Sequence, residues 1–124
     1  MRSLQFLDVR RLEMTDIAPP AAPGNGEVTV RIKAVALNHI DVWGWRGMAF
    51  AKRKMPLTIG AEASGVVEAI GPGVSNALSG QLVPIYGART CGLCKPCREK
   101  RDNLCEHVSG VHGCHLHGSA QDKA

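Results

Sequence analysis

The sequence predicts a mainly β fold, a small β-barrel or sandwich of short strands with one excursion loop. Glycine and proline, with 14 and 7 residues among 124, indicate many turns. Residues 27–37 alternate apolar and polar side chains with the period of a β-strand. Four of the five cysteines fall between Cys91 and Cys105, in a polar stretch that interrupts the strand pattern. A chain of this length is expected to form one domain, residues 1–124.

The first half of the chain contains three expected strands. The segments LQFLDV (4–9) and RLEM (11–14) read as two short strands, followed by the breaker-rich loop APPAAPGNG (18–26). The third strand, EVTVRIKAVAL (27–37), is the clearest. Its apolar face is expected to contain Val28, Val30, Ile32, Ala34 and Ala36. After it, Asp41 is expected to begin a short helix whose inner side carries Val42 and Trp45.

The second half contains shorter strand signals. Residues 65–70 read as a strand, and the glycine-rich break at 71–73 suits a hairpin. The segment GQLVPIYG (80–87) reads as another strand, in which Pro84 favours an edge or a strand end. The last stretch, GVHGCHLHGSAQ (110–121), has strand alternation that three glycines weaken.

Composition and charge argue against three classes of protein: membrane-spanning, secreted and nucleic-acid-binding. No run of eighteen apolar residues is present, so we expect no membrane span, and the mixed charge of residues 1–14 is unlike a secretory signal. We therefore expect a cytoplasmic protein with reduced thiols. The net charge is +4, but a dication held by four thiolates would lower it to +2. The basic residues are dispersed, and the run KRK (52–54) reads as solvated surface, so no nucleic-acid partner is expected.

The cysteine spacing is C-x2-C-x2-C-x7-C, formed by Cys91, Cys94, Cys97 and Cys105. Two-residue gaps let successive thiolates reach one ion, and four cysteines are the usual ligands of a closed structural zinc site. Residues 91–105, here called the cysteine lobe, contain few apolar side chains, so bound metal would supply their folding energy. Two alternatives are less favoured: an iron–sulfur centre, whose C-x3-C-P continuation is missing, and a redox C-x-x-C pair, which needs a βαβ context.

These motifs together resemble a known family. The cysteine lobe is similar to the structural zinc loop of the zinc-type alcohol dehydrogenases in the medium-chain dehydrogenase/reductase superfamily. GAEASGVVEAIGPGV (60–74) is similar to their G-H-E-x-x-G signature, and GQLV (80–83) to their G-D-x-V turn. Residues 27–47 and 110–121 also match expected segments. The resemblance covers roughly residues 28–121, and it implies the N-terminal catalytic domain, a GroES-like, partly open β-barrel with one or two short helices.

The resemblance also implies an altered catalytic site. The first zinc-ligand position holds Asn38, and the histidine of G-H-E is replaced by Ala61. Glu62 alone cannot hold an ion, so we expect one structural zinc and no catalytic zinc. Asn38 and Asp41 match the N-x-x-D segment of the zinc-free quinone oxidoreductase branch. Asn38, Asp41 and Glu62 are the candidate cleft residues, although Asp41 capping the helix and Glu62 pairing with a base remain the simpler interpretation. A second zinc on His107, His112 and His117 is less favoured than a polar turn.

Members of this superfamily continue into a Rossmann domain, and its G-x-G-x-x-G motif is missing here. NAD(P) is therefore expected only if a separate Rossmann domain is supplied, and the chain alone is expected to be inactive. Alternatives are a zinc-stabilised protein-interaction module, a truncated pseudoenzyme and, more weakly, an iron–sulfur carrier. We expect a homo-oligomer or a separate nucleotide-binding subunit to cover an apolar face, formed by Met48, Phe50 and Met55 with Trp43 or Trp45.

Overall fold

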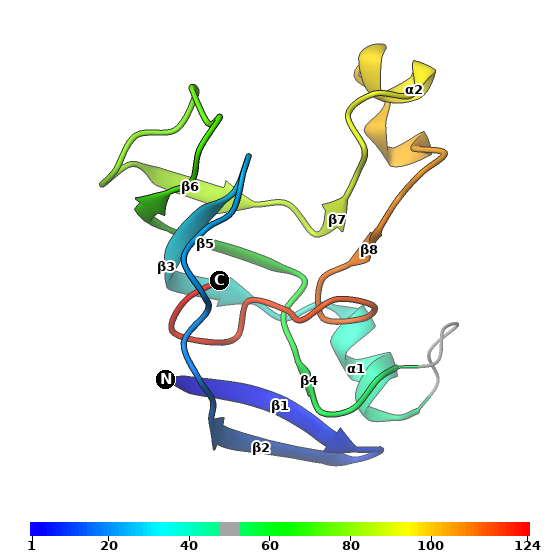
Figure 1. The fold of residues 1–124 in the computed structure, drawn as a ribbon. Helices are drawn as coiled ribbons and strands as arrows, with labels where there is room; N and C mark the ends of the chain where they lie inside the picture. Colours follow the sequence, from blue (N-terminus) through cyan, green and yellow to red (C-terminus); the bar gives the residue numbers. More distant parts are fainter. Residues whose placement is uncertain (48–52) are drawn as a thin grey trace.

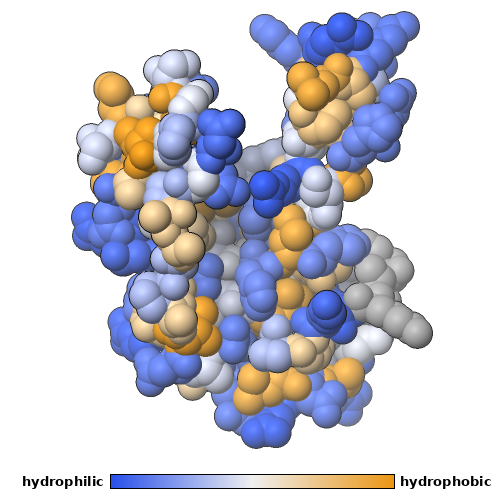
Figure 2. All heavy atoms as spheres, viewed as in Figure 1, coloured by the Kyte–Doolittle hydropathy of each residue, from blue (hydrophilic) through white to orange (hydrophobic). Residues whose placement is uncertain are grey.

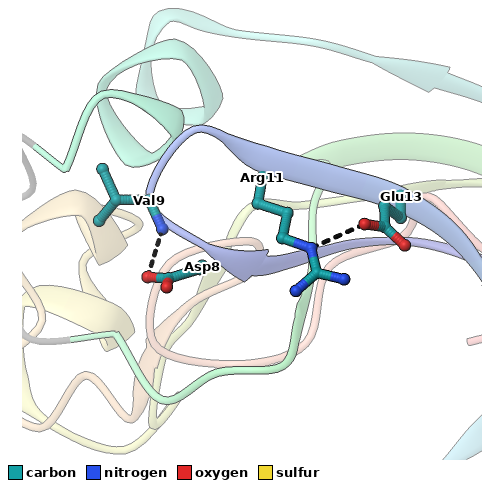
Figure 3. Close-up of polar contacts among 4 residues, drawn as sticks. All are labelled: Asp8, Val9, Arg11 and Glu13. Carbon is teal, nitrogen blue, oxygen red and sulfur yellow. Dashed lines mark hydrogen bonds and ion pairs between the residues drawn. The ribbon is translucent and has the colours of Figure 1, made fainter.

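The computed structural model describes residues 1–47 and 53–124, and its fold is mainly β (Figure 1). The first sheet has three strands in the order β2-β1-β4. Their bounds are β1 Arg2–Asp8, β2 Arg11–Asp16 and β4 Leu57–Thr58. Strands β1 and β2 correspond to the first two expected strands, and the structure pairs them as an antiparallel hairpin. Its turn uses Arg10 at φ 58°, and the Val9 N–H donates to Asp8 Oδ1 at 2.7 Å (Figure 3).

The second sheet has the order β3-β5-β6, with all neighbours antiparallel. It contains β3 Val28–Ala36, β5 Glu62–Ile70 and β6 Leu82–Ile85. Pro84 lies in the edge strand β6, as expected from its missing N–H. The connection from β5 to β6 covers residues 71–81, so it is a longer loop than the tight turn expected at 71–73.

The expected apolar face of β3 is correct only for the first half of the strand. Ile32 pairs with Gly65 and Ala34 with Ser64, so Lys33 is an extra residue in the ladder. Such a β-bulge moves the following side chains to opposite faces. Val30 is buried, but Ala34 and Ala36 are exposed, and Val35 is turned inward instead.

The last residues of the chain join the two sheets and close the barrel in part. On one side, the Leu4 N–H donates to the Ala120 carbonyl at 2.8 Å, and Asp122 bonds Arg2. On the other side, Val30 and Ala124 exchange two backbone hydrogen bonds of 2.7 and 2.9 Å. The tail 118–124 therefore lies between β1 and β3, and Figure 1 shows it crossing the centre of the molecule.

The core lies between the two sheets and is small. Its buried apolar side chains are Phe6, Val30, Leu57, Ile59, Ala61, Val67 and Cys114. Beside it, the hydroxyls of Ser3 and Thr58 share a hydrogen bond of 2.9 Å, and Gln5 Nε2 donates to Thr58 Oγ1. These buried polar groups are paired, so they cost little on folding.

One helix packs on the barrel and two short helical turns lie in the cysteine lobe. Helix α1 covers His39–Trp45 and begins after Asn38, whereas Asp41 was the expected start. Its buried residues are Asp41 and Gly44, while Val42 and Trp45 are 42% and 40% exposed, so the expected inner side is wrong. No helix within the described residues is long and apolar enough to span a membrane.

The cysteine lobe projects from the barrel on two short strands (Figure 1). β7 Ala88–Arg89 and β8 Gly110–Val111 pair antiparallel, which brings the two ends of the lobe together. The lobe itself contains α2 Lys95–Arg98 and the 3-10 turn η1 Asp102–Leu104. β8 is the only regular strand in the segment 110–121, so the strand alternation expected there is confirmed only at its start.

Candidate metal centre

The secondary structure of the cysteine lobe places its four thiols around one point. Cys94 is the N-cap of α2 and Cys97 lies within that helix, while Cys105 follows η1 as its C-cap. Cys91 comes soon after β7, at the base of the lobe. The paired strands β7 and β8 hold this base closed, so the short helical turns bring the later cysteines back toward Cys91.

The four sulfur atoms lie within 4.8 Å of one another. The Sγ atoms of Cys91 and Cys97 are 3.9 Å apart, and all four residues are free cysteines. A tetrahedral zinc with Zn–S bonds of about 2.3 Å would separate its sulfurs by about 3.8 Å. The cluster therefore has the dimensions of a site for a single ion, and its donor set is the one that structural zinc uses.

Backbone N–H groups surround the sulfurs and favour their charged form. Cys91 Sγ accepts from the N–H groups of Cys94 and Leu93 at 3.3 and 3.4 Å. Cys105 Sγ accepts from the N–H groups of Cys91 and His107, both at 3.4 Å. Hydrogen bonds donated to a sulfur stabilise a thiolate, which is the form that binds metal.

The surroundings of Cys91 and Cys97 shift the pKa values of these two thiols in opposite directions. The N–H groups of Cys94 and then Leu93 lower the pKa of Cys91 from 9.0 to about 6. Desolvation, followed by hydrogen bonds with the thiols of Cys94 and Cys105, raises the pKa of Cys97 from 9.0 to about 12. These opposite shifts favour the thiolate at Cys91 and the neutral thiol at Cys97, and metal binding requires the thiolate form of both.

The candidate cleft residues come together where β3 ends and β5 begins. Ala36 pairs with Glu62, so Asn38 follows one strand end and Ala61 precedes the other. Asn38 is half-buried and Ala61 is buried, whereas Glu62 is exposed. Glu62 forms no ion pair within residues 1–47 and 53–124, so the expected pairing with a base is not seen there. Glu62 and Tyr86 line a hollow of about 520 Å³ beside these strand ends.

Both carboxylate oxygens of Asp41 accept hydrogen bonds from backbone N–H groups. Its carboxylate accepts from the Asn38 N–H at 2.9 Å through Oδ2, and from the buried Gly60 N–H at 3.0 Å through Oδ1. The side chain is 4% exposed. Gly60 has φ +93°, and a Cβ there would lie 2.8 Å from Val35 Cγ1, so the close approach requires glycine. Asp41 thus ties α1 to the segment before β5, which agrees with its interpretation as a helix-capping residue at the third helical position.

Three of the histidines contact backbone groups through Nδ1. His117 Nδ1 accepts from the Thr58 N–H and His115 Nδ1 from the Val111 N–H, both at 3.2 Å. His112 Nδ1 donates to the His117 carbonyl at 2.8 Å. Among the described residues, only the four cysteines bring three or more possible ligand atoms together. The alternative of a second zinc on His107, His112 and His117 gains no support from this arrangement.

Sequence reasoning missed the position of Arg53. The run KRK reads as solvated surface, and Lys54 is indeed exposed, while Lys52 lies outside the described residues. The Arg53 guanidinium instead lies over the Phe6 ring, 5.5 Å from its centroid, and Nη2 donates to the Ile40 carbonyl at 2.9 Å. The available signal was Gly44 in the helix, because its missing Cβ leaves the space that Arg53 Nη1 occupies.

The family model of the alcohol dehydrogenase GroES-like domain matches residues 24–124. The chain is 38% identical to maize (Zea mays) alcohol dehydrogenase class-3 over 103 residues, which are 82% of this chain and 26% of that protein. It is 34% identical to L-threonine 3-dehydrogenase of Chromobacterium violaceum over 102 residues, which are 81% of this chain and 30% of that protein.

Solved structures agree with these sequence matches. A crystal structure of an NAD-dependent alcohol dehydrogenase has a TM-score of 0.88 and 41% identity, and the match covers 100% of this chain and 36% of that one. A thermostable alcohol dehydrogenase from Pyrobaculum aerophilum has a TM-score of 0.87 and 32% identity, and the match covers 100% of this chain and 38% of that one. The chain thus spans well under half the length of these relatives. With its fold and cysteine cluster, it belongs to the family of alcohol dehydrogenase GroES-like domains.

Proposed function

We propose that this chain is the zinc-stabilised GroES-like part of a nicotinamide-dependent oxidoreductase that has no catalytic zinc site. The observation that carries the proposal is the four-sulfur cluster, whose atoms lie within 4.8 Å, on a barrel of the alcohol dehydrogenase family. The ligands would be Cys91, Cys94, Cys97 and Cys105. All four coordination positions would be filled by protein, so this zinc would stabilise the fold and would not bind substrate.

The cleft supports the second half of the proposal. At the two strand ends, the positions of the family's metal ligands hold the amide of Asn38 and the methyl group of Ala61. Neither side chain is a good zinc ligand, and both oxygens of Asp41 already accept backbone hydrogen bonds. Among these residues only Glu62 presents an exposed carboxylate. Polarisation of a carbonyl group would then depend on hydrogen-bond donors, and the nicotinamide would supply the hydride.

Metal analysis of the purified chain tests the first half. We expect one zinc per chain, no visible absorbance, and loss of the zinc in Cys97→Ser. The matched control is Cys114→Ala, which removes the fifth cysteine from the buried core and keeps the zinc. A brown protein would indicate an iron–sulfur centre, and zinc loss in the control would place Cys114 in the ligand set.

A nicotinamide fluorescence titration tests the second half. We expect no micromolar binding of NADH or NADPH by this chain alone, because the sequence of residues 1–124 contains no G-x-G-x-x-G phosphate-binding motif. Binding and activity would require a nucleotide-binding domain. Tight binding by the chain alone would contradict the proposal, even if the zinc result holds.

Exposed apolar side chains support the need for a partner. Trp43 and Trp45 are 44% and 40% exposed on α1, and Leu37 just before it is 64% exposed. Met48 and Phe50, part of the expected apolar face, lie outside the described residues. We propose that a second copy or a nucleotide-binding subunit covers this side in a reducing, cytoplasmic setting. Light scattering at micromolar concentration should show self-association of the chain alone, and a monomer would favour the separate subunit.

A further inference from the structure

A hollow lies on the outer face of the second sheet, where β3, β5 and β6 are adjacent. Its volume of about 520 Å³ is within the range of roughly 300–1,000 Å³ that small-molecule sites occupy. In its lining, Ala34 pairs with Ser64, and Ser64 pairs with Pro84. Two positions along the same face, Ala36 pairs with Glu62. Because alanine and serine side chains are short, these rows form a low floor, and the hollow is the space above it.

The strand register places a carboxylate opposite an aromatic ring at this hollow. Ala63 pairs with Ile85 at the end of the β5–β6 ladder, so the next position brings Glu62 opposite Tyr86. The two backbones stay close beyond that point, because a Cβ on Gly87 would lie 3.1 Å from the carbonyl oxygen of the residue before Glu62. Side chains that face each other across antiparallel strands have Cβ atoms about 5 Å apart. Both Glu62 and Tyr86 line the hollow, so a ligand there can reach the carboxylate and the ring together.

Glu62 lacks a positive partner, in contrast to the other carboxylate on the same strand. Glu68 Oε1 is 3.9 Å from Arg31 Nε, and Glu68 Oε2 is 2.7 Å from Lys123 Nζ. Glu62 is exposed, and none of the ion pairs within residues 1–47 and 53–124 includes it. Among the described residues that line the hollow, Glu62 alone is charged. The hollow therefore presents one accessible negative charge beside largely apolar walls.

We propose that this hollow binds a small alkylammonium ion, a protonated primary amine with a short apolar chain. The ammonium group donates hydrogen bonds to the Glu62 carboxylate. Tyr86 is 60% exposed, so its ring is accessible to the same cation. The apolar chain packs on Pro84 and the alanine floor, which favours an alkylated amine over bare ammonium. Binding here requires neither zinc nor nicotinamide, so it is tested separately from the oxidoreductase proposal.

Titration of the zinc-loaded chain with n-butylammonium chloride at constant ionic strength tests the site. The ring resonances of Tyr86 report binding, because this is the single tyrosine of the chain. The methyl resonance of the ligand gives a second measure of affinity that does not depend on the tyrosine. We expect saturable shifts of both. Butan-1-ol has the tail without the charge, and ammonium chloride has the charge without the tail. Each should bind about threefold or more weakly, because an exposed ion pair and a short tail each contribute modestly.

Matched variants locate the charge and the ring. Glu62→Gln keeps the shape of an exposed side chain and removes its charge, so it should weaken butylammonium binding about threefold to fivefold and leave butan-1-ol unchanged. Glu68→Gln is the control, because it removes a carboxylate of the same strand that does not line the hollow. The six intervening steps span about 20 Å, beyond the screening length in salt, so the control should bind butylammonium normally. Tyr86→Leu, measured through the ligand resonance, should weaken butylammonium more than butan-1-ol.

Three results would overturn the proposal. The first is equal affinity for butylammonium and butan-1-ol, which would leave the carboxylate without a role. The second is equal binding of butylammonium by Glu62→Gln and the original chain, or equal weakening in Glu62→Gln and Glu68→Gln, which would indicate general attraction to surface charge. The third is a shift that rises linearly with ligand concentration and does not saturate.

Discussion

The barrel and the cysteine lobe are held together by different interactions. In the barrel, Phe6, Ile59 and Val67 are at most 2% exposed, and the tail 118–124 bonds strands from both sheets. In the lobe, no residue from 91 to 105 is buried, and Leu93 is 80% exposed. Figure 2 shows the lobe standing apart from the barrel at the upper right, where polar residues surround a small apolar group on the near face.

The two regions differ in the source of their folding energy. Burial of apolar surface stabilises the barrel. The half-buried residues of the lobe are the four cysteines, Pro96 and Asp102, so burial there is small and centres on sulfur. On the zinc proposal, a bound metal ion would then be the main source of order for the lobe. The two regions should respond independently to changes in metal binding and in apolar packing.

Removal of one thiol from the lobe should change zinc affinity and local order more than any other substitution considered below. Cys97→Ser removes one of the four proposed ligands, so zinc affinity should fall by orders of magnitude and the lobe should lose its fixed structure. Limited proteolysis should cut within residues 91–105 and leave the rest resistant. If the lobe stays protected in this variant, metal is not what orders it.

Removing Phe6, the aromatic residue at the centre of the core, should destabilise the barrel and leave the lobe with its metal. Phe6 is 1% exposed, and Phe6→Ala should lower the free energy of unfolding by about 3–5 kcal/mol. Chemical denaturation measures this change. Zinc content should stay at one per chain under native conditions, and a parallel loss of zinc would show that the two regions are coupled.

A smaller effect is expected at the buried carboxylate. Asp41→Ala leaves the buried Gly60 N–H unpaired, so stability should fall by about 1–3 kcal/mol. Asp41→Asn is the matched control, because its amide oxygen can still accept one of the two hydrogen bonds and should lower stability less. Equal losses in the two variants would show that charge, and not hydrogen bonding, is what matters there.

The smallest effect is expected at the surface of the hairpin. Arg11 Nε and Glu13 Oε1 are 2.7 Å apart on β2, but both side chains are largely exposed (Figure 3). Exposed ion pairs contribute little because water and salt screen them. The midpoint of thermal unfolding should therefore be the same in Glu13→Gln as in the original chain. A clear decrease would mean that this edge strand contributes more than its exposure indicates.

The sequence predicted the parts of the structure that follow from local patterns. Alternation identified β3, and the cysteine spacing identified a cluster that the structure brings within 4.8 Å. The bulge at Lys33 was not predictable, because it depends on how β3 pairs with a distant strand. The tail 118–124 could not be placed from local patterns, because it bonds β1 and β3, which are distant in the sequence. The inward position of Arg53 likewise depends on its contacts with Phe6 and Gly44.

Hydrogen exchange before and after zinc removal measures whether the order of the lobe depends on metal while the barrel folds without it. The zinc-loaded chain should show slow exchange in β1, β3 and β5 and measurable protection in the cysteine lobe. After chelation, protection should be lost from residues 91–105, including the N–H groups of Leu93 and Cys94 that donate to Cys91, while the barrel strands stay protected. Unchanged protection in the lobe, or unfolding of the whole chain when the metal is removed, would contradict a self-folding barrel that carries a metal-dependent lobe.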